Sequence, residues 1–371
     1  MAGKRVDIVV TTIFEPKFLD GYVENIRKHG RDGTRIIVIP DRKTPASVYE
    51  RAKFHGAICP TLDEQETFLA RFPSLAQRIP YDSDNRRNVG FLMALDGGAE
   101  LLITIDDDNY CLDDSDFVGE HLAAGESVSD DEIHSSDGWF NICSLLAANT
   151  PAEIWPRGFP YFARRRDKEI TRRPAPPSRA AMNVGLWLSD PDVDALTRLA
   201  VAPNIESFRG ESVRLADDTW SPINTQNTAI VRDAITAYYY VRMGFSLGGL
   251  RIDRYGDICS GYFLQKCVKA RGEAIRVGTP IADHRRTPHN LFKDLSQELA
   301  GMVLLDDLLA WLVNLKLDGS SYHDLYAALA DAIEEKAATM RGFVWDEGGR
   351  EFLHDTAANM RAWLEAVKLI G

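Results

Sequence analysis

The sequence predicts an α/β fold: a mixed sheet flanked by helices, followed by a helical C-terminal appendage. Val6–Thr12 has a strand pattern, 18–29 has helical spacing, and 35–40 forms a second strand pattern. This alternation is typical of a sheet that starts with parallel strands. A third strand, 101–105, runs into three consecutive aspartates. We therefore expect a sheet domain over 1–290 and an appendage over 291–371.

The composition is that of an ordinary globular protein, with 371 residues, 45% hydrophobic and 26% charged. A net charge of −12 makes a nucleic-acid surface improbable. The five cysteines are scattered and none forms a CxxC pair, which disfavours a zinc site and a disulfide framework and indicates reduced thiols in a cytoplasm. We expect no signal peptide and no membrane span.

Further elements follow from periodicity and turn residues. Helical patterns after the first helix, which we expect to end at Gly30, cover 87–95, 228–243 and 261–271. Strand patterns cover 183–188 and 274–280. The polar stretches 125–137 and 164–177 indicate loops.

The C-terminal part is rich in leucine at helical spacing. A helix over 292–317 carries Leu304, Leu308 and Leu312 on one broad face, and Ser321 is placed to cap the next helix. Met360, Trp363, Leu364 and Val367 form a further apolar stripe. Core packing is the simplest interpretation of these faces, and a homo-oligomer contact is the alternative.

The octet Leu101–Asp108 is the most informative stretch of the chain. A short apolar run predicts a buried strand, and its C-terminal end is where open α/β sheets bind ligands. At strand spacing Asp106 and Asp108 point to one side and Asp107 to the other. Three adjacent carboxylates suit a hard divalent metal that also contacts phosphate oxygens. An acidic surface turn is the alternative interpretation.

Other polar residues each allow two interpretations. His284 follows the late strand and would complete a metal site with Asp108, or it is a surface histidine. Arg285 and Arg286 beside it would offset diphosphate charge, or they are ordinary exposed arginines. Asp257 is either a helix N-cap or a group that orients a sugar hydroxyl or acts as general base. Asn227 opens the helix predicted from 228, either as a cap or as a ligand contact.

The segment 155–161 joins an arginine to three aromatic residues. Aromatic rings beside Arg157 suit a sugar or base pocket, although an ordinary Pro-rich turn packed on the core has the same composition. Motif searches find no GxSxG, HExxH or Walker A sequence. No GxGxxG follows the first strand, so neither NAD nor a flavin is expected.

Taken together, these segments resemble the reversibly glycosylated polypeptides, within the wider family of NDP-sugar pyranose–furanose mutases built on the GT-A, Rossmann-like fold. The matching stretches are 7–12, 87–108, 156–164, 185–199, 227–233, 254–261 and 278–284. The resemblance covers roughly residues 5–295.

The resemblance implies roles for individual residues. It assigns Asp106, Asp107 and Asp108 to the metal and nucleotide, with His284 as a further metal ligand. Nucleotide and sugar contacts are implied for a second set of residues: Asp41, Arg87, Asn227 and Arg285. Arg157 matches an arginine that becomes glycosylated in the family, and Arg164 and Asp257 match an arginine and an acid near it. A guanidinium is a poor nucleophile, so we expect Arg157 to act as a clamp on the diphosphate or the sugar cation.

The implied activity is a Mn²⁺- or Mg²⁺-dependent, flavin-independent interconversion of pyranose and furanose forms of a UDP- or GDP-linked sugar. Two alternatives stay open: a transferase that passes the sugar to a separate acceptor, and a nucleotide-sugar-binding protein without catalysis.

Overall fold

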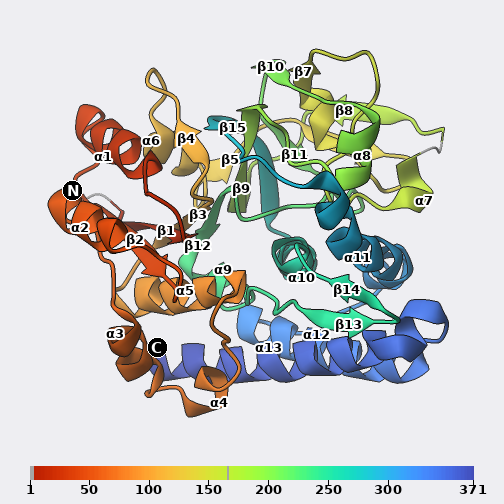
Figure 1. The fold of residues 1–371 in the computed structure, drawn as a ribbon. Helices are drawn as coiled ribbons and strands as arrows, with labels where there is room; N and C mark the ends of the chain where they lie inside the picture. Colours follow the sequence, from red (N-terminus) through yellow and green to blue (C-terminus); the bar gives the residue numbers. More distant parts are fainter. Residues whose placement is uncertain (1–3, 165–166) are drawn as a thin grey trace.

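The computed structural model describes residues 4–164 and 167–371 and confirms the predicted mixed α/β class with flanking helices. The main sheet has the strand order β2-β1-β3-β12-β9-β15-β11-β6-β8 (Figure 1). These strands span Thr34–Pro40, Val6–Thr12, Leu101–Ile105, Asn227–Val231, Ser178–Ser189, Ala274–His284, Val213–Leu215, Glu132–Ser135 and Ile170–Arg173. β1, β2 and β3 are parallel, β12 is antiparallel to β3 and to β9, and β15 is parallel to β9, so the sheet is mixed, as expected.

Shorter strands extend the sheet or form a separate hairpin. These are β4 (Asn109–Cys111), β5 (Ser127–Val128), β7 (Leu146–Ala148), β10 (Ile205–Phe208), β13 (Phe245–Leu247) and β14 (Leu250–Ile252). β4 pairs antiparallel with the end of β15, which brings the chain after the three aspartates beside His284.

Helices flank the sheet, and α5 packs against β1 and β2. The helices before the C-terminal part are α1 (Phe18–Lys28), α2 (Ala46–His55), α3 (Leu62–Leu69), α4 (Pro73–Ala76), α5 (Arg87–Asp96), α6 (Phe117–His121), α7 (Tyr161–Arg164), α8 (Ala195–Ala200), α9 (Arg232–Ile235) and α10 (Gly256–Ala270). Short 3₁₀ turns lie at Asp84–Arg86 (η1) and Ile142–Leu145 (η2). Every residue of β3 is buried, as its apolar sequence predicts.

The predicted helix over 228–243 is wrong. The chain forms β12 and then the single turn α9, because the β-branched Thr228, Ile230 and Val231 fill a fully buried position between β3 and β9. The apolar run has no period that separates strand from helix. Asn227 therefore begins a strand and is not a helix cap.

The two predicted loops also contain strands. The stretch 125–137 holds β5 and β6, and 164–177 holds β8, which pairs with β6 at the edge of the sheet. Edge strands face solvent and carry polar residues, so their sequences do not alternate clearly. Arg165 and Arg166, within the second stretch, lie outside the described residues.

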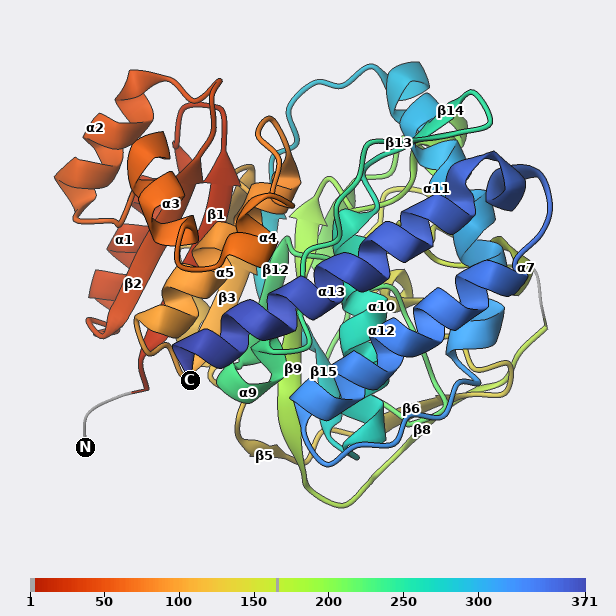
Figure 2. The same ribbon diagram turned by 90° about the horizontal axis from the view of Figure 1, so that it is seen from below.

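The C-terminal helices are α11 (Leu291–Leu312), α12 (Tyr322–Thr339) and α13 (Arg350–Ile370), with the turn η3 (Trp345–Gly349) before the last. Ser321 caps α12 in a capping box with Asp324, as predicted. Figure 2, which views the molecule from below, shows α12 and α13 side by side across the face nearest the viewer. The leucine faces are buried, so they serve core packing, whereas a domain boundary at 290 and an oligomer contact stay predictions. No helix in the described ranges has both the length and the apolar character needed to cross a bilayer.

Candidate functional site

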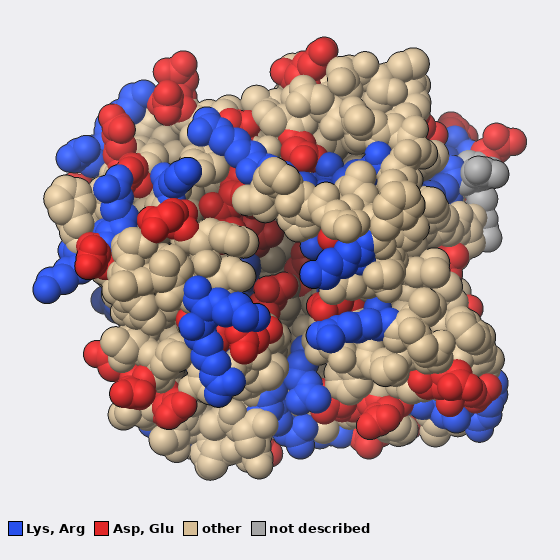
Figure 3. Space-filling view, viewed as in Figure 1, with Lys and Arg blue, Asp and Glu red and all other residues tan. Residues whose placement is uncertain are grey.

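A cleft of about 320 Å³ lies at the carboxyl-terminal ends of the central strands of the main sheet. β1, β3, β9 and β15 all point their C-terminal ends to this cleft, and the antiparallel β12 begins there. Its walls therefore collect residues from separate parts of the chain: Thr12, Asp41, Asp84, Asp106, Asp107, Asp108, Asp192, Thr225, Gln226 and His284. Figure 3 shows a hollow at the centre of this face, with acidic side chains inside it and basic side chains beside its mouth.

The three aspartates after β3 diverge. Asp106 pairs with Arg87 at 2.7 Å, and Asp107 accepts a hydrogen bond from Thr12 at 2.5 Å. Asp108 Oδ2 lies 3.3 Å from Nε2 of His284. Burial raises the pKa of Asp107 to about 7, whereas His284 outweighs burial at Asp108 and lowers the pKa of that carboxyl. The three carboxyl groups therefore have different partners, and the pKa of Asp107 and that of Asp108 shift in opposite directions.

Asp108 and His284 fit one side of a divalent-cation site. Oxygen and imidazole ligands suit manganese, and Mg²⁺-like ions complete their shells with phosphate oxygens and water. His284 Nδ1 contacts the backbone oxygen of Asp190, which fixes the ring. No group of three His, Cys, Asp or Glu side chains poised to hold a metal occurs in 4–164 or 167–371. Asp106 faces Arg87, so its role as a metal ligand stays a prediction.

Arg157 is almost fully buried, with 6% of its surface exposed, between two carboxylates. Its Nε and Nη2 donate to Asp192 at 2.9 and 3.0 Å. Nη1 and Nη2 donate to Asp257 at 3.1 and 2.7 Å, and Nη1 also contacts the backbone oxygen of Arg254. All five N–H donors of the guanidinium are thus engaged within the protein. A hydrogen-bonded clamp on a diphosphate would require Arg157 to exchange one of these partners.

Asp257 is not a helix N-cap. α10 begins at Gly256 with Tyr255 at the cap position, and Asp257 lies in the first turn, where both carboxylate oxygens accept from Arg157. The aromatic residues of the 155–161 segment, Trp155, Phe159 and Tyr161, are in the core or packed against it. Arg157 is the residue of this segment that lines the cleft.

Asp192 is a site residue that the sequence analysis missed. Burial raises its pKa, but the charge and hydrogen bonds of Arg157 prevail and lower the pKa to about 2. Asn224 donates to the same carboxylate at 2.6 Å. Asp192 follows the predicted strand 183–188, so the rule that ligands bind at strand ends could have indicated it.

Two predicted nucleotide-binding residues line the cleft. Asp41 accepts from the backbone of Arg42 at 2.7 Å and of Ser83 at 3.2 Å. Arg87 donates to Thr104 at 2.9 Å in addition to Asp106, and its buried Nε has no hydrogen-bond partner within the described part of the chain.

Three other predicted site residues stand apart from the cleft. Arg164 pairs with Asp194 and lies over the ring of Tyr161 at 3.7 Å. Arg285 is 61% exposed at its side chain and pairs with Asp283 at 2.6 Å. Asn227 is fully buried and bonds His121 at 2.9 Å and the backbone oxygen of Pro280 at 2.9 Å. Each has a structural role here, and contact with a ligand stays a prediction.

Two arginines that line the cleft form ion pairs with the C-terminal part of the chain. Arg254 pairs with Glu298 at 2.9 Å, and Arg286 pairs with Asp294 at 2.7 Å. Both acids lie in the N-terminal half of α11. The sequence analysis did not connect α11 with the site, because no local pattern links acids in that helix to arginines before it.

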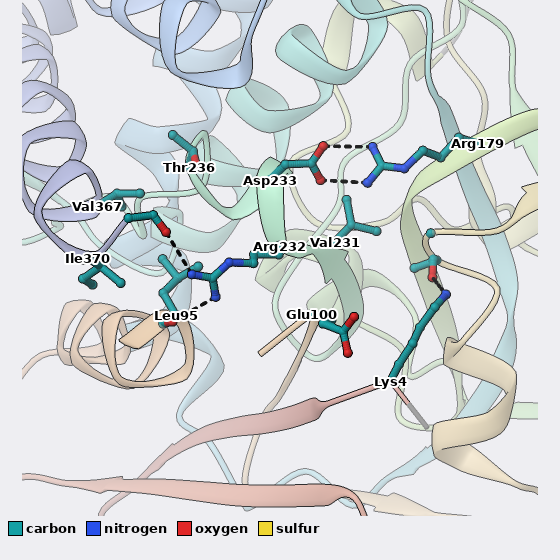
Figure 4. Close-up of a pocket in the computed structure, with 13 residues that line it drawn as sticks. Lys4, Leu95, Glu100, Arg179, Val231, Arg232, Asp233, Thr236, Val367 and Ile370 are labelled. Atoms are coloured by element: carbon teal, nitrogen blue, oxygen red, sulfur yellow. Dashed lines mark hydrogen bonds and ion pairs between the residues drawn. The ribbon is translucent and has the colours of Figure 1, made fainter. Parts of the chain in front are cut away.

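A second hollow, of about 540 Å³, lies at the opposite end of β3. Figure 4 shows Arg179 paired with Asp233, and Arg232 turned toward the backbone near Leu95 and the last turn of α13. Its charged side chains thus bind the protein itself.

Comparison with known proteins identifies the family. A family model described as "Reversibly glycosylated polypeptide" matches residues 1–371. A probable UDP-arabinopyranose mutase 1 of Zea mays is 26% identical over 62% of this chain and 62% of its own length. UDP-arabinopyranose mutase 2 of Arabidopsis thaliana is 25% identical over 72% of this chain and 68% of its own length. The matched region thus spans less than two thirds of the maize protein.

Among solved structures, glucosyl-3-phosphoglycerate synthase from Mycobacterium tuberculosis in complex with Mn²⁺ and UDP-glucose aligns with a TM-score of 0.39 and 14% identity, over 82% of this chain and 79% of that chain. Since the family model spans every residue of the sequence, the chain belongs to the reversibly glycosylated polypeptide family.

Proposed function

We propose that the protein is a metal-dependent, flavin-independent mutase that interconverts the pyranose and furanose forms of a UDP-linked sugar. The observation that carries this proposal is the cleft itself. It places the Asp108–His284 pair and the paired Arg157 and Asp257 in one cavity at the ends of β3, β15 and α10. The names of the maize and Arabidopsis relatives support the uridine nucleotide and the reaction class.

Asp108 and His284 would hold the divalent cation, Mn²⁺ or Mg²⁺. Such an ion, when bound, neutralises diphosphate charge and makes the nucleotide a better leaving group. Arg87 adds positive charge at the same wall of the cleft, where burial opposes ionisation but Asp106 raises the pKa of the guanidinium and keeps it charged.

The sugar end of the cleft would be formed by Arg157, Asp257 and Tyr240. A carboxylate there stabilises the cation that forms when the anomeric bond breaks. Arg157 acts on this step through Asp257, since its own donors are occupied. The reaction needs no redox group, because it exchanges one carbon–oxygen bond for another.

Incubation of the protein with manganese and a UDP-pyranose, without an acceptor, tests the proposal. We expect the UDP-furanose isomer to accumulate to equilibrium, as followed by chromatography and NMR. Hydrolysis to free sugar without isomer would indicate a transferase deprived of its acceptor. Unchanged substrate despite tight binding would indicate a non-catalytic binding protein.

A panel that includes GDP-sugars sets the base preference. We expect turnover with UDP-sugars alone.

The two proposed metal ligands can be tested by substitution. Asp108→Asn and His284→Gln should weaken manganese binding by about 10-fold or more, the usual effect of losing a ligand or its support. Manganese titration by calorimetry in the presence of UDP measures this without relying on activity.

A further inference from the structure

Two carboxylates of the same cleft have opposite surroundings. Asp257 accepts two hydrogen bonds from Arg157 and is nearly fully buried. Asp84, on η1, is exposed to the cleft, and its carboxylate has no hydrogen bond or ion pair with any residue that the structure describes. One carboxylate is therefore fixed and the other is free to bind a ligand.

Asp84 nevertheless lies in a charged environment. The enclosing protein raises its pKa most, and Asp253 and Asp257 raise it further, whereas Arg87 and Arg254 lower it. Tyr240 is the phenol on which the charges of Asp84 and Asp257 both act. Arg87, which lines the same cleft, is held in place by its hydrogen bonds to Asp106 and Thr104.

Exchange of ring size moves a proton as well as a bond. In contraction, the hydroxyl oxygen on carbon 4 bonds to carbon 1 of the sugar cation and must lose its proton. The bond from carbon 1 to the oxygen on carbon 5 then breaks, and that oxygen must gain a proton. One carboxylate can accept the first proton and return it to the second oxygen, so that atoms and charge balance without another reactant.

We propose that Asp84 is the catalytic carboxylate that carries this proton between the two hydroxyl oxygens, while Asp257 remains a fixed anion beside the sugar cation. This assignment rests on the mutase activity proposed above. Asp257 is unsuited to the shuttle because both of its oxygens are committed to Arg157, whereas Asp84 has both oxygens available.

Positional isotope exchange separates the two steps. A UDP-pyranose with ¹⁸O in the bond between carbon 1 and the β-phosphate scrambles the label whenever that bond breaks and reforms, and ³¹P NMR records the scrambling. In Asp84→Asn we expect isomerisation to fall by about 100-fold or more, the usual size of a lost general acid–base group, while scrambling stays near the wild-type rate.

The control is Asp253→Asn, which removes one negative charge near Asp84 but leaves the carboxyl group of Asp84 in place. We expect it to retain isomerisation and to move the acidic limb of the pH–rate profile to lower pH, because one charge that raises the pKa of Asp84 is gone. Isomerisation within a few-fold of wild type in Asp84→Asn would overturn the assignment, and so would equal losses of isomerisation and scrambling. If the wild-type protein scrambles or hydrolyses substrate but never isomerises it, the proposed function itself fails.

Discussion

The two hollows at opposite ends of β3 differ in how their charges are satisfied. In the larger one, Arg179 binds Asp233 (Figure 4). Arg179 also binds Glu273, and Arg232 donates to three backbone oxygens. In the smaller one, Asp84 has no partner in the described chain, and Arg87 keeps an unpaired Nε. The first hollow thus holds charged side chains that are already paired, whereas the cleft holds a carboxylate that is free to bind a ligand, and this difference identifies the cleft as the candidate site.

The largest expected effect compares two arginines, one from each hollow. Arg157→Met leaves Asp192 and Asp257 buried without their partner, so we expect the free energy of unfolding to fall by about 3–5 kcal/mol. Arg179 is 39% exposed, and Arg179→Met should cost about 0–1 kcal/mol. Urea denaturation measures both. Equal losses would mean that the Arg157 cluster is no more tightly coupled than a surface pair.

The next comparison uses the two ends of one strand. Glu100 precedes β3 in the larger hollow and Asp106 follows it in the cleft. We expect Asp106→Asn to lower kcat/KM for isomerisation by about 10²–10³-fold, as for other lost electrostatic groups. Glu100→Gln should leave kcat/KM unchanged. A similar loss in Glu100→Gln would show that the far end of the sheet also serves the reaction.

A buried histidine, His121, predicts that the stability of the fold depends on pH. His121 is fully buried and bonds Asn183 and Asn227, and burial lowers its pKa to about 3. The unfolded chain takes up the proton first, so stability is complete above about pH 6.5 and decreases toward pH 3, by at most about 1.4 kcal/mol per pH unit. Denaturation midpoints of wild type and His121→Gln between pH 4 and 8 measure this slope. If both proteins lose stability in parallel, His121 is not the cause.

The smallest expected effect concerns neighbouring arginines. Arg286 lines the cleft and Arg285 does not, since it stacks over Tyr110 at 4.3 Å. We expect Arg285→Ala to change the KM for the UDP-sugar by less than about twofold, and Arg286→Ala to raise it about 5- to 10-fold, in line with about 1–1.4 kcal/mol for one charge-assisted contact. The reverse order would restore the nucleotide contact that the sequence predicted for Arg285.

The sequence predicts well wherever one local pattern dominates. The apolar run before Asp106 fixed the central strand, and Ser321 with Asp324 marked a helix start. It fails at 228–231, because a buried strand and a buried helix share the same apolar composition. Asp192 and Asp84 could not be predicted for another reason. Asp192 contributes through its hydrogen bonds with Arg157, 35 positions earlier in the sequence. Asp84 is notable because its carboxylate has no partner in the described chain, and a sequence does not show the absence of a contact.

Because α11 pairs with two arginines that line the cleft, the C-terminal helical part of the chain helps to shape that cleft. A fragment ending at residue 290 would lack Glu298 and Asp294. Arg254 and Arg286 would then lose these carboxylate partners. The charge that the cleft presents to a ligand is therefore set in part by acidic residues of α11 that do not line the cleft themselves.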